Sequence, residues 1–195
     1  MSSVFDRRSV LDSGNNSFPQ RKVISCCPDS LHSFIITNAL TLSACASNPL
    51  SAVKTFSYKG GIHQEGQVTY TEHPPVGGPH NPHWQRCGVY DKPLYEQYAV
   101  HSMEHGAVWI TYQPSLPAAE IEKLKTAVQG HAYALLSPYP GQSTPVVLSA
   151  WNTQLPLDSV DAATIGAFLA KYEQGPTAPE HGAPCDGPFS VTETQ

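Results

Sequence analysis

The sequence predicts an α+β fold in which two to three helices pack against a mixed β-sheet, with a long ordered loop rich in proline and glycine. Two observations predict it. After residue 52, apolar residues recur at strand and helix periods in the order β-β-loop-α-β-α-β-β-α. The 195 residues include 18 prolines and 14 glycines but only 14% charged residues, which is typical of a compact domain with many turns rather than of disorder.

The first half of this order surrounds the loop. Residues 53–72, VKTFSYKGGIHQEGQVTYTE, contain two strand-like runs around a Gly-Gly turn. Residues 73–94 have no periodicity, but they carry histidines, a tryptophan and a tyrosine, which favour an ordered functional loop over a linker. The next segment, LYEQYAVHSMEH, can form about three turns of helix, with Gly106 as its C-terminal stop.

The second half contains the clearest helices. AVWITY predicts a buried strand that ends before Pro114, and AYALLSPYP and PVVLSAWN predict two more strands. LPAAEIEKLKTAVQG predicts a helix, because proline and acids lie near its start, lysines follow and a glycine ends it. SVDAATIGAFLAKYEQG predicts another helix, with Ser159 as N-cap and Gly175 after its end. Residues 176–190 then predict an extended segment that needs an anchor.

The chain is expected to divide into a leader and linker at 1–52, one globular domain at 53–187 and a disordered tail at 188–195. Arg21 and Lys22 precede an apolar stretch that ends in Leu42-Ser43-Ala44-Cys45, which is the order of a secretory signal. This ending resembles a bacterial lipobox, in which the cysteine is lipidated and becomes the mature N-terminus. The stretch is too short and too polar to be a transmembrane helix.

The leader therefore predicts an exported lipoprotein, anchored to the cell membrane on its extracytoplasmic side through a lipid on Cys45. Because the basic residues lie far inside the chain, we expect translation to start downstream of Met1. The alternative is a disordered tail before a cytosolic domain. Beyond Cys45 only Cys87 and Cys185 remain, and an even pair in an exported chain predicts a disulfide, with two free buried thiols as the alternative.

Charge and motifs exclude several classes of function. The formal net charge is −5 and no cluster of lysines and arginines is longer than a pair, so nucleic acid is not an expected partner. The sequence contains neither a phosphate-binding loop nor a G-x-S-x-G motif, which removes the basis for nucleotide and serine-hydrolase functions. The sequence does not identify a protein partner.

The histidines carry the strongest functional signal. His101 and His105 are four residues apart on the predicted helix and share one face, with Glu104 beside them. The string His-Ser-Met-Glu-His has the H-x-x-E-H form of inverted zinc proteases, but the helix of those enzymes continues, whereas Gly106 and a strand follow here. Met103 points away from the histidine face. The loop offers His80 as a third ligand.

We therefore predict a transition-metal site, for zinc or copper, formed by His80, His101 and His105, with Glu104 as a fourth ligand or an orienting residue. His63 and His83 are possible additional ligands. Two alternatives stay open: a zinc-dependent hydrolase with Glu104 as general base, and a metal-free cell-surface interaction module.

Residues from about 55 to 187 resemble a bacterial family of domains of unknown function, family 3105. The likeness rests on a Pro-Pro-x-Ser-Gly-x-His loop, a Gly-Val-Tyr, a Val-His-x-Leu-Glu-His-Gly and a Gly-Ala-Pro-Cys. These match Pro74, Pro75, Gly78 and His80, then residues 88–90, 100–106 and 182–185. Gly77 replaces the usual serine and Met103 the usual leucine. The resemblance implies exported or membrane-anchored proteins without an established activity.

Overall fold

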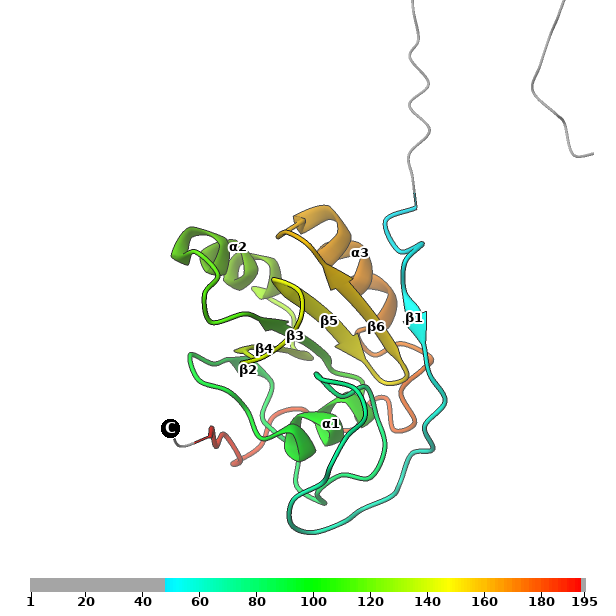
Figure 1. Cartoon of the computed structure of the whole chain (residues 1–195). Helices are drawn as coiled ribbons and strands as arrows, with labels where there is room; N and C mark the ends of the chain where they lie inside the picture. The colour runs from blue at the N-terminus through cyan, green and yellow to red at the C-terminus, as the bar shows by residue number, and fades with distance from the viewer. Residues whose placement is uncertain (1–47, 194–195) are drawn as a thin grey trace, which may run out of the picture. The chain divides into compact units, whose positions relative to one another are not determined.

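Six strands form one mixed sheet in the computed structural model, which describes residues 48–193 (Figure 1). The sheet order is β1-β6-β5-β3-β4-β2. The central strand β3 pairs parallel with β4 and antiparallel with β5, and β2 adds a short parallel edge beside β4. The strands are β1 (Lys54–Thr55), β2 (Gly88–Val89), β3 (Val108–Tyr112), β4 (Ala134–Pro138), β5 (Val146–Ala150) and β6 (Thr153–Leu157).

Three helices cover the sheet: α1 (Glu96–Glu104), α2 (Ala118–Val128) and α3 (Ala162–Tyr172). Helices α2 and α3 lie on one face and α1 lies on the other (Figure 1). The mixed sheet with its three helices confirms the α+β class.

Both faces of the sheet are buried, which explains why every residue of β3 is buried and only Thr111 among them is polar. Val108, Ile110 and Tyr112 point into the core under α2 and α3, while Trp109 points into the core around α1. Successive side chains of a strand alternate between faces, so a strand covered on both sides is mostly apolar, and the buried Thr111 donates its hydroxyl to the carbonyl of Val147.

The structure differs from the expected elements in four places. Gly88 and Val89 form the edge strand β2 within the segment expected to be a loop. Only Lys54 and Thr55 of residues 53–72 form a strand, and the rest of that segment is irregular. Strand β6 was not expected, because Pro156 and its polar neighbours obscure the strand pattern. The N-cap of α3 is Asp161, whose carboxylate accepts the N–H of Ala163, rather than Ser159.

The C-terminal segment packs against the domain where we expected a disordered tail from residue 188. The carbonyl of Phe189 accepts the N–H of Arg86 at 2.7 Å, and its ring lies 4.4 Å from that of Tyr98. A disulfide joins Cys87 to Cys185, 98 residues later, and ties this segment to the loop. Cys45 and the leader lie outside the described residues. Within residues 48–193, none of the helices has the length and hydrophobicity that a membrane crossing requires.

Candidate metal centre

The C-terminal end of helix α1 buries three titratable side chains. His101, Glu104 and His105 have exposed fractions of only 4%, 0% and 3%. The helix spacing of three and four residues places them on neighbouring positions of one face. Segments before and after α1 in the sequence cover this face, since backbone atoms of Gly61, Asn81 and Pro184 contact these side chains. The end of α1 is therefore enclosed by loop rather than exposed to solvent.

The loop before α1 adds two more histidines. The N–H of His80 donates to the carbonyl of Ile62 at 3.0 Å, and the N–H of Gln64 donates to the carbonyl of His80 at 2.7 Å. These two bonds hold His63 beside His80, with ring centroids 5.0 Å apart. The His80 side chain is fully buried, whereas 41% of the His63 side chain is exposed.

Each buried histidine uses Nδ1 in a hydrogen bond to a backbone carbonyl. His80 bonds to Gly78 at 2.8 Å, His101 to Asn81 at 2.7 Å, and His105 to Pro184 at 2.7 Å. A carbonyl oxygen can only accept, so Nδ1 must carry the hydrogen in all three rings. In the neutral ring this leaves the lone pair on Nε2, and a second partner that fixes the tautomer in this way is typical of metal-ligating histidines.

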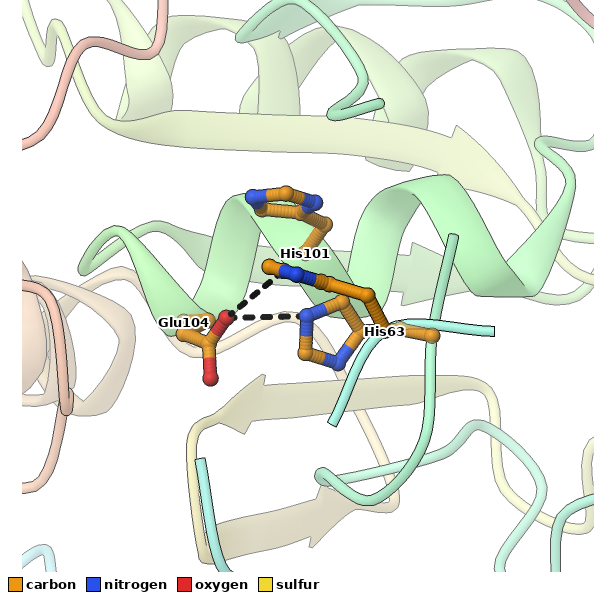
Figure 2. Close-up of side chains that lie close together, drawn as sticks. His63, His101 and Glu104 are labelled. Atoms are coloured by element: carbon orange, nitrogen blue, oxygen red, sulfur yellow. Dashed lines mark ion pairs between the residues drawn. The ribbon is translucent and has the colours of Figure 1, made fainter. Parts of the chain in front are cut away.

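The free Nε2 atoms converge with the Glu104 carboxylate. Nε2 of His80 lies 2.8 Å from Oε2 of Glu104, and Nε2 of His63 lies 3.7 Å from the same oxygen. Figure 2 shows Glu104 and His101 side by side on α1, with His63 reaching toward the carboxylate from the opposite loop. Nε2 of His101 and Nε2 of His105 are 2.9 Å apart.

The Glu104 carboxylate is only partly compensated. Its Oε1 accepts the N–H of Gly61 at 2.5 Å. Its Oε2 lies within ion-pair distance of Nε2 of His80, but in the neutral ring the hydrogen is on Nδ1, where it is bonded to the Gly78 carbonyl. Among the described residues, neither atom therefore has a hydrogen-bond partner. A buried carboxylate in this position is costly unless a cation compensates it.

The cluster contains one charged carboxylate and at least one neutral ring at pH 7. Burial, the largest influence, lowers the pKa of His101 to about 4, so its Nε2 is unprotonated. Burial tends to raise the pKa of Glu104, but the neighbouring His80 ring and the Gly61 N–H outweigh it and hold this pKa below its ordinary value. Nε2 of His105 therefore faces a bare lone pair on His101, and the two nitrogens repel unless a proton or a metal ion lies with them.

The segment after α3 contributes Glu180, which sequence reasoning missed. The N–H of Glu180 donates to the backbone carbonyl of Glu104 at 3.0 Å, and its Oε2 lies 3.7 Å from Nε2 of His105. The only sequence signal was the expected Cys87–Cys185 bridge, which brings this segment back to the histidine-rich loop. The possible ligand atoms form two overlapping groups, each within 4.8 Å: His63, His80, His101 and Glu104, and His101, His105 and Glu180.

The structure does not bring His83 to the cluster. Its ring stacks on Phe189 at 5.8 Å, in a cavity of about 210 Å³ that Trp84 and Pro188 also line. Trp84 itself packs on His105 at 5.0 Å and donates its Nε1 hydrogen to the carbonyl of Asp186 at 3.0 Å. Trp84 therefore contacts the cluster through His105, whereas the neighbouring His83 points away from the cluster toward Phe189.

A family model described as "Protein of unknown function (DUF3105)" matches residues 62–187 of the chain. The chain belongs to the DUF3105 family. The matched residues include both cysteines of the disulfide and all six residues of the two donor groups. No curated protein and no solved structure is detectably similar to the chain.

The donor atoms of this DUF3105 domain are imidazole nitrogens and carboxylate oxygens. Within the part of the chain that the structure describes, both cysteines form the disulfide, and Met103 is buried in the core between α1 and the sheet. The cluster therefore offers neither thiolate nor thioether, the soft ligands that copper(I) prefers. Imidazole and carboxylate together suit zinc or copper(II).

Proposed function

We propose that this DUF3105 protein binds a transition metal ion, zinc or copper, at the cluster of histidines around Glu104. The observation that carries the proposal is the convergence of Nε2 of His80 on a fully buried carboxylate oxygen, with both atoms lacking a hydrogen-bond partner among the described residues. His101 and His63 supply further nitrogens on the same side. A divalent cation would satisfy all of these atoms at once.

The spacing of the donors supports a metal ion. Ligands at about 2.0–2.1 Å from one zinc ion are about 2.9–3.4 Å apart, depending on the angle between them. The 2.8 Å separation of the His80 and Glu104 atoms is close to this range, and the 3.7 Å separation of the His63 and Glu104 atoms needs only a small closure. The backbone bonds to Nδ1 already hold the buried rings in the tautomer that a metal requires.

The contacts of Glu104 favour a ligand over a general base. Its side chain is fully buried, one oxygen holds the Gly61 N–H, and the other faces the His80 ring. A general base must reach a water molecule that also contacts a substrate. Metal binding is therefore better supported than hydrolysis with Glu104 as the base.

Metal content tests this proposal directly. Untagged full-length protein is purified without chelator, and zinc and copper are measured beside those of His101→Ala, Glu104→Gln and His83→Ala variants. We expect wild type and His83→Ala to hold the same amount of metal, because His83 lies on Phe189 outside the cluster, and the other two variants to hold clearly less. Circular dichroism checks that each variant is folded. Near-zero metal in all four proteins, with no uptake on titration, would end the proposal.

We also propose that the protein is an extracytoplasmic lipoprotein. Two features support this: the lipobox-like Leu42–Cys45 string and the Cys87–Cys185 disulfide, which is a bond typical of oxidising compartments. Growth of a bacterial host with a labelled fatty acid should label the wild type in the membrane fraction and leave Cys45→Ser unlabelled. Equal labelling of the two proteins would argue against this anchor.

A further inference from the structure

The six donor residues divide by distance into two sets of two histidines and one carboxylate. In the first set, His80 and Glu104 are 2.8 Å apart and His63 lies 3.7 Å from the same carboxylate oxygen. In the second set, the two imidazole nitrogens of His101 and His105 are 2.9 Å apart, and Glu180 lies 3.7 Å from His105. The close pair in each set, at 2.8 and 2.9 Å, is near the spacing of two neighbouring ligands on one ion, about 2.9–3.4 Å.

His101 decides how the donors are shared, because it lies within reach of both groups. Its Nδ1 hydrogen is bonded to the Asn81 carbonyl, so only Nε2 is free to ligate and the residue can serve one ion at a time. The short contact from this atom to Nε2 of His105 pairs the two rings. The residues that remain, His63, His80 and Glu104, are sufficient to hold a first ion without His101.

We propose that the cluster is a dinuclear centre in which His63, His80 and Glu104 hold one metal ion and His101, His105 and Glu180 hold a second. This inference rests on the proposed function and extends it from one ion to two. Each set has one carboxylate, so the charge of each divalent ion is partly offset by its own ligand. Three protein ligands per ion also leave a coordination position free on each.

Solvent can reach both sets of ligands. One ligand in each set is partly exposed, with 41% of the His63 side chain and 47% of the Glu180 side chain open to solvent, whereas the four others are buried. Water, or an oxygen anion that bridges both ions, would complete the coordination. Two ions that share such an oxygen are typically about 3.5–4 Å apart.

Metal stoichiometry tests the second ion. Full-length apoprotein is titrated with zinc, and bound zinc per chain is counted for wild type, Glu180→Gln and the surface control Glu122→Gln. Glu122 lies on α2, where it pairs with Lys125. We expect two ions in the wild type and in the control, and one in Glu180→Gln. Because Glu180 is half exposed, its replacement by glutamine should leave the fold intact.

Copper(II) gives a second readout that does not depend on counting. Two copper(II) ions about 4 Å apart couple magnetically, so the loaded wild type should show a broadened or reduced EPR signal, and Glu180→Gln the signal of a single isolated ion.

One zinc per wild-type chain would overturn the dinuclear centre and leave the single-ion proposal standing. Two zinc ions in Glu180→Gln would place the second ion elsewhere and also overturn it. No zinc in the wild type would remove both proposals.

Discussion

Gly60 allows the backbone to approach the Glu104 carboxylate closely. A Cβ atom at this position would lie 2.5 Å from Cβ of Pro179 and 2.7 Å from Oε1 of Glu104, closer than any relaxed contact. The next residue, Gly61, has a φ of 72° and donates its N–H to the same oxygen. The Gly-Gly pair therefore lies between the Glu104 carboxylate and the C-terminal segment. It does not form the turn between two strands that the sequence predicted.

A methyl group at Gly60 should therefore disturb the metal centre. We expect Gly60→Ala to displace Glu104 or Pro179 and to weaken metal binding about 10–100-fold, the range seen when residues that orient ligands are changed. The overpacking should also cost about 1–3 kcal/mol of stability. Zinc titration and chemical denaturation measure the two effects.

Gly166→Ala is the matched control, because Gly166 lies on the exposed side of α3 with no atom within 4 Å of the added carbon. That variant should bind metal normally and be more stable than wild type by about 0.5–1 kcal/mol. Unchanged metal affinity in Gly60→Ala would show that the close approach to Glu104 does not matter for the site.

At the scale of single residues, the sequence predicted the members of the side-chain cluster whose spacing is local. His101, Glu104 and His105 follow from one helical turn, and His80 followed from the histidine content of the neighbouring loop. Glu180 could not be predicted in the same way, since it lies 76 positions after Glu104 in a segment without periodicity. Its place depends on long-range contacts, namely the Glu180–Glu104 backbone hydrogen bond and the disulfide.

At the scale of elements, the C-terminal end of α1 determines where its ligands point. Gly106 has a φ of 101°, a conformation that other residues rarely adopt. The chain after α3 is fixed to this turn, because the N–H of Gln174 donates to the carbonyl of Gly106 at 2.9 Å and its side-chain amide donates to the carbonyl of His105 at 2.6 Å. The turn thus joins the end of α1 to the segment that carries Glu180.

Gly106→Ala should weaken both the fold and the site. The substituted residue would adopt a strained φ, at a cost of about 1–3 kcal/mol, and its Cβ would also collide with Gln174. Gly130 provides the comparison, since its φ is 86° but nothing lies within 4 Å of a Cβ there. We expect Gly106→Ala to lose more stability than Gly130→Ala, and only Gly106→Ala to lose metal affinity. Equal losses of stability in the two variants, measured by thermal unfolding, would mean that backbone strain lowers the stability and that the collision with Gln174 does not.

Element prediction succeeded where a segment carries its own signals. The segments of α2 and α3 have apolar residues at helical spacing and recognisable ends, and β3 is rich in apolar and aromatic residues. Residues 56–87 contain strand-like residues but form almost no strand, because their backbone instead contacts α1 and the C-terminal segment. Propensity alone cannot distinguish such a segment from a sheet edge, since the deciding contacts are tertiary.

At the scale of the whole domain, the two faces of the sheet have different roles. The face under α2 and α3 is an apolar core formed by regular elements. On the face under α1, two irregular segments cover the helix, namely the loop before α1 and the C-terminal segment. The Cys87–Cys185 bridge joins these two segments. We therefore expect the proposed metal centre to depend on the disulfide more than the core does.

Removal of the bridge in a Cys87→Ser, Cys185→Ser variant should lower the free energy of unfolding by about 2–4 kcal/mol, as for other disulfides that close long loops. The second set of ligands should weaken most, because Pro184 and Glu180 lie in the released segment. If the double variant bound zinc with the affinity of the wild type, the bridge would not contribute to the site.

Metal and disulfide should stabilise the same part of the domain, and their effects should therefore be coupled. Zinc at 100 times its dissociation constant stabilises the form that binds it by about 2.7 kcal/mol, which is roughly 5–11 °C in the unfolding midpoint of a domain of this size. In the wild type, chelator should lower the midpoint by this amount. In the double serine variant zinc must also order the segment that carries Glu180, so the same zinc concentration should raise the midpoint less.

Hydrogen exchange should show this segment opening first without metal, whereas β3 and β5 stay protected. A midpoint that neither chelator nor zinc changes would mean that no ion stabilises the end of α1.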